Sequence, residues 1–320
     1  MSFAMDYSRL GETDPTVSRL GYGASALGNM YTPVTDEEAA RSVSIAMEEY
    51  GINYFDTAPS YGLEGLSETR LGKALAGKRQ KVVLNTKCGR YDHWGDGRFE
   101  FTYEPKRMRL EVENSLRRLQ TDYIDVLQIH DAGMRIEAEY IIQETMPELV
   151  KLKEEGKIRY IGVSGKPLDY LKKVADTCSD HVDVMLTFGD YCLREQNLEA
   201  KFAQLTEKKR YGIVNSSVTF MGFITKKGKG VVGMKGPFKD RLEACAEEAN
   251  ALCEAAGTEL GELAVKFGFD CEHCADSTLI SMSRESRVRQ NAELYFHRKE
   301  YDPELAEKVK AIMARSVGKV

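Results

Sequence analysis

Short apolar runs alternate with longer amphipathic segments along almost the whole chain. Eight runs stand out, at residues 20–23, 51–56, 81–87, 123–130, 158–164, 182–188, 211–217 and 277–283. Each has the length of a buried strand, and the segments between them show the three-to-four-residue spacing of a helix. The alternation predicts repeated strand–helix units and therefore a parallel sheet.

Helix signals support this interpretation. Residues 35–50 begin with Thr35 and have Glu38 three residues later, which is the spacing of a capping box. Residues 104–120 have a proline near their first turn, where a helix tolerates it, and place their apolar side chains on one face. Two further consecutive helices are predicted at 242–257 and 259–270.

Eight strand–helix units in a chain of 320 residues predict a closed (β/α)8 barrel. We expect residues 1–320 to form this single domain, with a short N-terminal segment before the first barrel strand and a C-terminal helix. An open doubly wound sheet is the alternative, and it usually carries a G-x-G-x-x-G sequence after its first strand. Residues 21–28, GYGASALG, do not satisfy that pattern, because four residues separate the second glycine from the next.

One long segment, residues 222–240, is rich in Gly and Lys and has no periodicity. It follows the seventh apolar run, and the loops after barrel strands lie on the catalytic face. Two interpretations stay open. The segment is either a surface loop or a lid whose lysines hold the phosphates of a cofactor.

Composition narrows the functional classes. The chain is 42% hydrophobic and 30% charged, with a net charge of −5, so it lacks the basic field of a general nucleic-acid-binding surface. No apolar run reaches the length of a membrane span, and the N-terminus lacks the apolar core of a signal peptide. We therefore expect a cytoplasmic protein that binds neither nucleic acid nor membrane.

The seven cysteines are scattered, which fits a reducing compartment better than a disulfide framework. Residues 271–274, Cys-Glu-His-Cys, are the one run that suggests a metal site. No second cysteine pair or spaced histidine pair completes a tetrahedral ligand set, so no metal is predicted.

Ionisable side chains stand at the ends of consecutive predicted strands. Asp56 ends the second run, Tyr61 follows it by five residues, and Lys87 and His130 end the third and fourth runs. Taken singly, each has a structural explanation, as a turn carboxylate, a loop aromatic, a solvated cation or a buried histidine. Because the carboxyl ends of barrel strands converge on one face, their joint occurrence predicts a reaction centre.

This set of side chains suits proton transfer by a phenol coupled to hydride transfer. An ammonium group beside Tyr61 would lower its pKa from an ordinary value of about 10, and Lys87 is the candidate for that group. Asp56 would keep the lysine charged and oriented. His130 would hydrogen-bond the oxygen on which charge develops.

The stretches around these residues resemble the aldo-keto reductase superfamily. They are GINYFDTAPSYG, NTKCG, SLRRLQTDYIDVLQIHD, YIGVSG and LISMSRESRVRQN. The resemblance implies a (β/α)8 barrel with NAD(P) across its C-terminal face and a catalytic tetrad of Asp56, Tyr61, Lys87 and His130. The segments NTKCGRY, IHD and YIGVSGKPLDYL are most similar to the branch of L-galactose dehydrogenases and aldose 1-dehydrogenases.

The same resemblance implies the contacts of the cofactor. Ser164 matches a residue that contacts the nicotinamide carboxamide, Gly165 stands where asparagine is frequent, and Tyr191 matches an aromatic that stacks on the nicotinamide. Phe188 stands where many members have glutamine. The remaining implied cofactor residues are Ser217, Ser283, Arg287 and Asn291.

Arg287 and Arg284 favour NADP, because an arginine near the adenosine can bind a 2′-phosphate, whereas the L-galactose enzymes prefer NAD. Both arginines could instead be solvated surface charges. Candidate substrate residues are Tyr22, Arg90, Tyr91, Trp94 and Asp131. Trp94, the one tryptophan, would either stack on a sugar ring or anchor its loop.

The resemblance implies an NAD(P)-dependent oxidoreductase that oxidises C1 of a small aldose, similar to L-galactose or L-fucose, to the lactone. A general NADPH-dependent aldehyde or ketone reductase is one alternative, and a cofactor-binding regulatory subunit with little turnover is another. The expected partner is a small aldose or carbonyl compound, and a homo-oligomer is left open.

Overall fold

The computed structural model describes residues 4–93, 98–225 and 236–317. At its centre is a closed barrel of eight parallel strands in which consecutive barrel strands are neighbours. The strands are β3 (Leu20–Gly23), β4 (Tyr54–Asp56), β5 (Val83–Cys88), β8 (Ile124–Ala132), β9 (Ile158–Gly165), β10 (Val182–Phe188), β11 (Gly212–Ser216) and β12 (Ser277–Ser281). Each predicted run overlaps one of them, so the predicted (β/α)8 barrel is confirmed.

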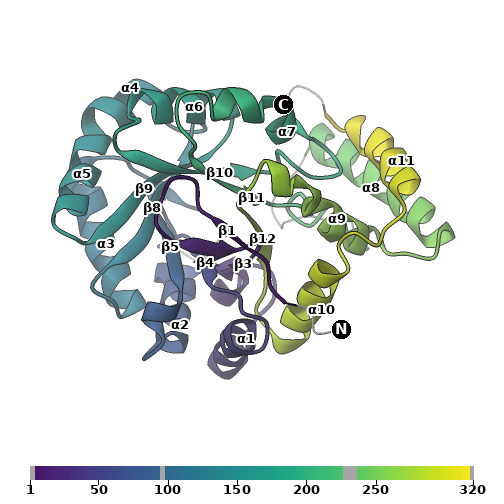
Figure 1. Ribbon diagram of the computed structural model, residues 1–320, viewed down its shortest axis with the longest axis horizontal. Coiled ribbons are helices and arrows are strands. Elements are labelled where there is room, and N and C mark those ends of the chain that lie inside the picture. The colour runs from purple at the N-terminus through teal and green to yellow at the C-terminus, as the bar shows by residue number, and fades with distance from the viewer. Residues whose placement is uncertain (1–3, 94–97, 226–235, 318–320) are drawn as a thin grey trace.

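Helices surround the barrel, and α8 and α11 pack against each other at one side of it (Figure 1). The helices are α1 (Asp36–Glu48), α2 (Leu66–Ala74), α3 (Pro105–Leu119), α4 (Ala138–Tyr140), α5 (Met146–Glu154), α6 (Leu168–Thr177), α7 (Asn197–Leu205), α8 (Pro237–Ala255), α9 (Leu260–Gly268), α10 (Glu285–Phe296) and α11 (Pro303–Ala314). Single helical turns lie at Ala24–Gly28, Leu63–Gly65, Arg79–Lys81, Ile141–Thr145 and Asp270–His273.

The residues predicted to start helices do so in the structure. Thr35 and Glu38 form the capping box of α1, in which each side chain binds the backbone N–H of the other residue. Pro105 occupies the first turn of α3, as expected. Helix α8 begins at Pro237, five residues before the predicted start, because a second proline serves its first turn.

A hairpin of β1 (Tyr7–Arg9) and β2 (Thr16–Ser18) closes the N-terminal end of the barrel. Figure 1 shows it lying across the strands. Leu10 and Val17 are fully buried and join the side chains that fill the barrel interior, among them Tyr54 and Val126. Because this end is plugged, the opposite end is left for ligands.

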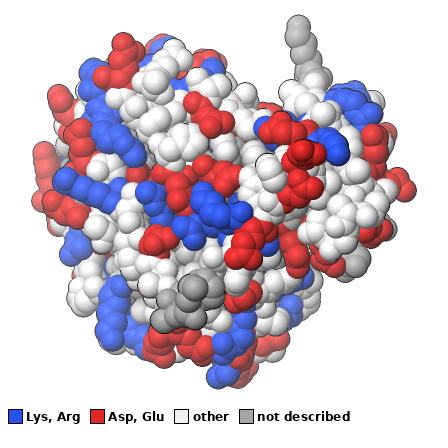
Figure 2. All heavy atoms as spheres, turned by 45° about the vertical axis from the view of Figure 1, so that its right-hand side comes forward, with Lys and Arg blue, Asp and Glu red and all other residues white. Residues whose placement is uncertain are grey.

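The charged surface is mixed. Figure 2 shows basic and acidic side chains side by side over one face of the molecule. In the described part of the chain, no helix is both long and apolar enough to cross a membrane.

Candidate active site

Asp56 and Lys87 form a buried ion pair between neighbouring strands. Asp56 is the last residue of β4 and Lys87 is near the end of β5, and they are 4% and 2% exposed. The lysine Nζ lies 2.6 Å from Asp56 Oδ1 and 2.9 Å from the carbonyl oxygen of Thr57, to which it also donates. The side-chain amide of Asn85 donates to Asp56 Oδ2. The carboxylate is therefore held through both of its oxygens.

The loop after β4 turns back so that Tyr61 faces the lysine. The Tyr61 amide donates to the carbonyl of Ala58 at 3.1 Å, and the Lys87 ammonium lies 5.0 Å from the centre of the phenol ring. Gly62 has φ +85°, and a Cβ there would lie 2.3 Å from the carbonyl oxygen of Gly28. Only glycine allows this close approach, so the turn depends on it.

His130 stands beside the phenol. Its ring is nearly perpendicular to that of Tyr61, at 88°, with ring centres 5.9 Å apart. Its backbone carbonyl accepts a hydrogen bond of 2.8 Å from the hydroxyl of Tyr103. Burial lowers the pKa of His130 to about 3, and Lys87 acts in the same direction. The imidazole is therefore neutral and can act as a hydrogen-bond donor to a substrate oxygen.

Lys87 and Tyr61 respond differently to burial. Burial disfavours the charged lysine, but Asp56 and Tyr61 outweigh it and raise the pKa of Lys87. For Tyr61, burial is the largest influence and raises the pKa above its ordinary value, although Lys87 acts to lower it. Lys87 thus acts in the expected direction, and the desolvation of the phenol exceeds the effect of this one ammonium group.

Arg90 and Asp131 form a second ion pair near the tetrad. Arg90 Nη1 lies 2.9 Å from Asp131 Oδ2, and their side chains remain 22% and 18% exposed. The guanidinium stacks on Phe99, with 3.9 Å between its carbon and the ring centre. Asp131 Oδ1 is 3.9 Å from His130 Nε2. These two candidate substrate residues thus lie together beside the histidine.

The other substrate candidates do not join them. Tyr22 is fully buried, and its hydroxyl is paired with Ser42 of α1 at 2.7 Å, so its ring faces the helix layer. Tyr91 is 1% exposed, and its hydroxyl accepts a hydrogen bond from the Gly89 amide at 2.9 Å. Both assignments are corrected, because each ring is packed inside the protein. Trp94 lies outside the described residues.

The strand ends beyond the tetrad carry the implied cofactor residues. Ser164, at the end of β9, is 2% exposed and donates to the carbonyl of Ile129 at 3.1 Å. Gly165 has φ +140°, and a Cβ there would lie 2.5 Å from the carbonyl oxygen of Ala132. The glycine that stands in place of asparagine is thus required by the backbone itself.

Tyr191 does not present an open ring. It is stacked on Phe267 of α9, with ring centres 5.1 Å apart and planes 5° from parallel, and only 4% of the residue is exposed. Phe267 therefore covers one face of the ring, and the role of Tyr191 as a nicotinamide platform stays a prediction. The sequence could not show this contact, because the partner ring is 76 residues away along the chain.

Arg284 and Arg287 both lie on the segment from β12 into α10, but their surroundings differ. Arg284 donates to Glu38, to Thr32 and to the carbonyl of Pro33, so it joins this segment to the loop before α1. Arg287 is exposed on the first turn of α10 and donates to the side chain of the neighbouring Gln290 at 2.7 Å. The remaining implied cofactor residues Ser283 and Asn291 are buried on the same segment, and Ser217 accepts a hydrogen bond from the Met221 amide.

These strand ends suit a dinucleotide. They supply hydroxyl groups, glycine backbone, an exposed arginine and the N-terminus of the twelve-residue helix α10, which is the donor set that phosphates prefer. Most of the Gly- and Lys-rich segment, residues 226–235, lies outside the described residues. Among the described residues, no group of three or more His, Cys, Asp or Glu side chains is placed to hold a metal ion.

Sequence reasoning missed two residues of this region. Asn85 binds the carboxylate of Asp56, and only its position two residues before Lys87 hinted at an inward-facing side chain. Tyr31 is 55% exposed in the loop before α1, and it acts on the pKa of Tyr61. No periodic signal marks Tyr31.

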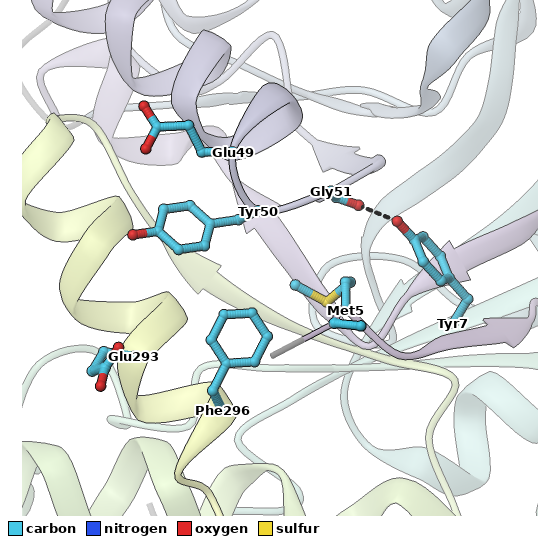
Figure 3. Close-up of a pocket in the computed structure, with 8 residues that line it drawn as sticks. Met5, Tyr7, Glu49, Tyr50, Gly51, Glu293 and Phe296 are labelled. Atoms are coloured by element: carbon cyan, nitrogen blue, oxygen red, sulfur yellow. Dashed lines mark hydrogen bonds between the residues drawn. The ribbon is translucent and has the colours of Figure 1, made fainter. Parts of the chain in front are cut away.

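A separate hollow lies at the other end of the barrel (Figure 3). It measures about 500 Å³ and is formed by the N-terminal segment, the end of α1 and α10. The Tyr7 hydroxyl donates to the carbonyl of Gly51 across one side of it, at 2.7 Å. No residue of the tetrad lines it, so it is not part of this site.

Comparison with known proteins identifies the family. Residues 19–314 match the aldo/keto reductase family. The chain belongs to this family. It is 36% identical over 286 residues to the L-galactose dehydrogenase of Arabidopsis thaliana, covering 88% of this chain and 85% of the relative. It is 29% identical over 298 residues to a D-threo-aldose 1-dehydrogenase of Pseudomonas, covering 87% and 89%.

Solved structures give the same result for this aldo-keto reductase. An aldo-keto reductase of Bacillus halodurans in its holo form superposes with a TM-score of 0.73 at 26% identity and covers 96% of both chains. A glycerol dehydrogenase of Gluconobacter oxydans gives 0.70 at 27% identity, covering 99% of this chain and 97% of the other. The protein is thus an oxidoreductase of a family that uses nicotinamide cofactors.

Proposed function

We propose that this aldo-keto reductase oxidises C1 of a small neutral aldose, similar to L-galactose or L-fucose, to the lactone. The carrying observation is the contact of 2.6 Å between Lys87 and Asp56 beside the phenol of Tyr61. The similarity to an L-galactose dehydrogenase and an aldose 1-dehydrogenase supports the choice of substrate class.

In this proposal the phenolate of Tyr61 accepts the proton of the C1 hydroxyl. Lys87 stabilises the phenolate, and Asp56 keeps the lysine charged and directed at the ring. His130, neutral because it is buried, hydrogen-bonds the reacting oxygen and orients it. When bound, the nicotinamide supplies the hydride acceptor. The barrel contributes by holding the reacting groups in contact.

Arg90 and Asp131 are proposed to contact the other hydroxyl groups of the sugar. Their charges compensate each other across 2.9 Å, so together they offer donors and acceptors without a net charge. Such a pair suits a neutral polyhydroxylated substrate better than an anionic one. Trp94 remains a candidate for stacking on the sugar ring.

For the cofactor, we propose that NADP is accepted through Arg287. Its guanidinium is exposed, whereas that of Arg284 is engaged by Glu38 and the loop before α1. An exposed arginine can make the bidentate contact that a 2′-phosphate offers. Ser164, Gly165, Ser217, Ser283 and Asn291 are proposed to line the rest of the cofactor site.

One observation favours a second candidate, the reduction of aldehydes or ketones with NADPH. Burial raises the pKa of Tyr61, so its phenol carries a proton at neutral pH. A protonated phenol is ready to donate to a carbonyl oxygen, whereas oxidation needs the phenolate.

An absorbance screen at the NAD(P)H band distinguishes the two. Aldoses are tested with NAD⁺ and NADP⁺, and aldehydes are tested with NADH and NADPH. We expect turnover with L-galactose or L-fucose in the oxidative direction. Turnover confined to carbonyl compounds would replace the first proposal by the second, and no turnover in either panel would contradict both.

A further inference from the structure

The buried carboxylate of Asp56 is held from β5 by two side chains, and only one of them is the lysine of the tetrad. Lys87 donates to Oδ1, and the amide of Asn85 donates to Oδ2. Asp56 and Asn85 are paired in register across β4 and β5, so this contact spans neighbouring strands directly. Asn85 and Lys87 are two positions apart on the strand, so both side chains point into the barrel.

We propose that Asn85 is a positioning residue of the catalytic centre: its amide fixes the rotation of the Asp56 carboxylate and thereby directs Lys87 toward Tyr61. The inference rests on the tetrad of the proposed function and adds a fifth side chain to it. Asn85 touches none of the atoms proposed to react, so it acts only through Asp56.

The burial of Asn85 gives this contact its importance. Asn85 is fully buried, so water does not compete for the carboxylate oxygen that it binds. Burial raises the pKa of Asp56, and the contacts of Lys87 and Asn85 work in the opposite direction. Without the amide, one carboxylate oxygen would lose its donor in a site that disfavours charge. The carboxylate would then rotate or take up a proton, and the lysine would lose its fixed partner.

The unpaired acceptor of the Asn85 side chain also supports a positioning role. Its own Oδ1 is buried and has no hydrogen-bond partner. An unpaired buried acceptor is unfavourable, and an apolar residue of similar size would avoid it. The amide is therefore explained by what its Nδ2 group does for Asp56, since packing alone would favour another residue.

A pH test has to consider the titratable groups coupled to Asp56. Lys87 on β5 lowers the pKa of Asp56, and Asp56 in turn raises the pKa of Tyr61 in the loop after β4 and of Tyr54 on β4. Burial raises the pKa of Tyr54 well above its ordinary value, so that phenol stays neutral. Asn85 is thus the donor to Asp56 that does not titrate.

The barrel offers a matched control in Gln128. It is also a fully buried amide of the interior, it lies opposite Lys87 in register on β8, and both of its side-chain polar atoms lack partners. Among the described residues, the Gln128 side chain makes no hydrogen bond to the tetrad. Asn85→Leu and Gln128→Leu therefore both replace a buried amide by leucine, and only the first removes a donor from Asp56.

The experiment measures kcat, KM, the Kd of the cofactor from its fluorescence, and the melting temperature for both variants. We expect Asn85→Leu to lower kcat by about tenfold or more, as the loss of a hydrogen bond to a charged group does, with KM and cofactor Kd within about threefold. Gln128→Leu should keep kcat within about threefold. A kcat for Asn85→Leu within twofold of the parent, or an equal loss in Gln128→Leu, would overturn the proposal.

Asn85→Asp provides a second readout, the pH dependence of kcat, which a mere packing role would not change. This variant keeps the shape of the side chain, so it remains informative if Asn85→Leu does not fold. Two carboxyl groups in contact share a proton, and the protonated one can donate to Asp56. We expect the ratio of its kcat to that of the parent to fall as pH rises, since the shared proton is then lost. A ratio that does not change with pH would contradict the proposal.

The Tyr61→Phe variant separates failure of this inference from failure of the proposed function. If Tyr61→Phe keeps full turnover, the proposed function itself fails. If Tyr61→Phe is inactive while both Asn85 variants behave as the parent, only this inference fails.

Discussion

The ion pair between Lys87 and Asp56 allows a quantitative test of how the barrel holds charge. Lys87→Met keeps the volume of the side chain and removes its charge, which leaves a carboxylate that is 4% exposed with Asn85 as its remaining donor. Removing one partner of a buried pair costs about 3–5 kcal/mol. For 320 residues at about 2.1 cal/mol/K of unfolding entropy per residue, that loss lowers the melting temperature by roughly 4–7 °C.

The sign of the pH dependence follows from the same contact. Without the ammonium, burial raises the folded-state pKa of Asp56 above its unfolded value of about 3.9, so the folded variant binds more protons than the unfolded one. Its stability is then retained at low pH and falls as pH rises through the window between the two pKa values, at about 1.4 kcal/mol per unit. The deficit relative to the parent should be larger at pH 8 than at pH 5.

The assay is thermal and urea unfolding followed by circular dichroism at both pH values. Lys73→Met is the matched control, because Lys73 pairs with Asp36 at 3.0 Å while both side chains are more than half exposed. Exposed pairs contribute about 1 kcal/mol or less, so this variant should lose little. Equal losses in the two variants, or a Lys87→Met deficit that is the same at pH 5 and pH 8, would refute the reasoning.

Three further predictions concern catalysis and the cofactor. Tyr61→Phe should lower kcat by roughly 10²–10⁴-fold while cofactor Kd, measured by fluorescence titration, stays within about twofold; lost cofactor binding with retained turnover would contradict the assignment. Because burial raises the pKa of Tyr61, the rate of sugar oxidation should increase with pH between 7 and 9. The increase should reach about tenfold per pH unit where deprotonation limits the rate. A rate that does not change with pH in stopped-flow measurements would argue against the phenolate as the base. Arg287→Ala should weaken NADP binding by about tenfold and leave NAD binding unchanged, whereas Arg284→Ala should affect both cofactors alike. Calorimetry that shows selective loss of NADP binding in Arg284→Ala instead would exchange the roles of the two arginines.

Local patterns in the chain were sufficient for the barrel and for placing Asp56, Tyr61, Lys87 and His130 at one end of it. Strand and helix periodicity depends on neighbours within a few residues, so all eight strands could be located. The spacing of Asp56 and Tyr61, and the places of Lys87 and His130 at strand ends, are also local features. Parallel strands in a barrel then bring their carboxyl ends together without further information.

Contacts between distant segments decided the rest. Tyr22 and Tyr191 looked suited to ligands, yet Ser42 and Phe267 engage them from helices that the sequence could not place against them. The net rise in the pKa of Tyr61 has the same origin, because burial is a property of the assembled barrel. Asn85 could be assigned to the interior from its spacing, but its bond to Asp56 required the register of two strands. Side-chain direction and desolvation depend on what packs against a residue, and the linear order of residues does not contain that.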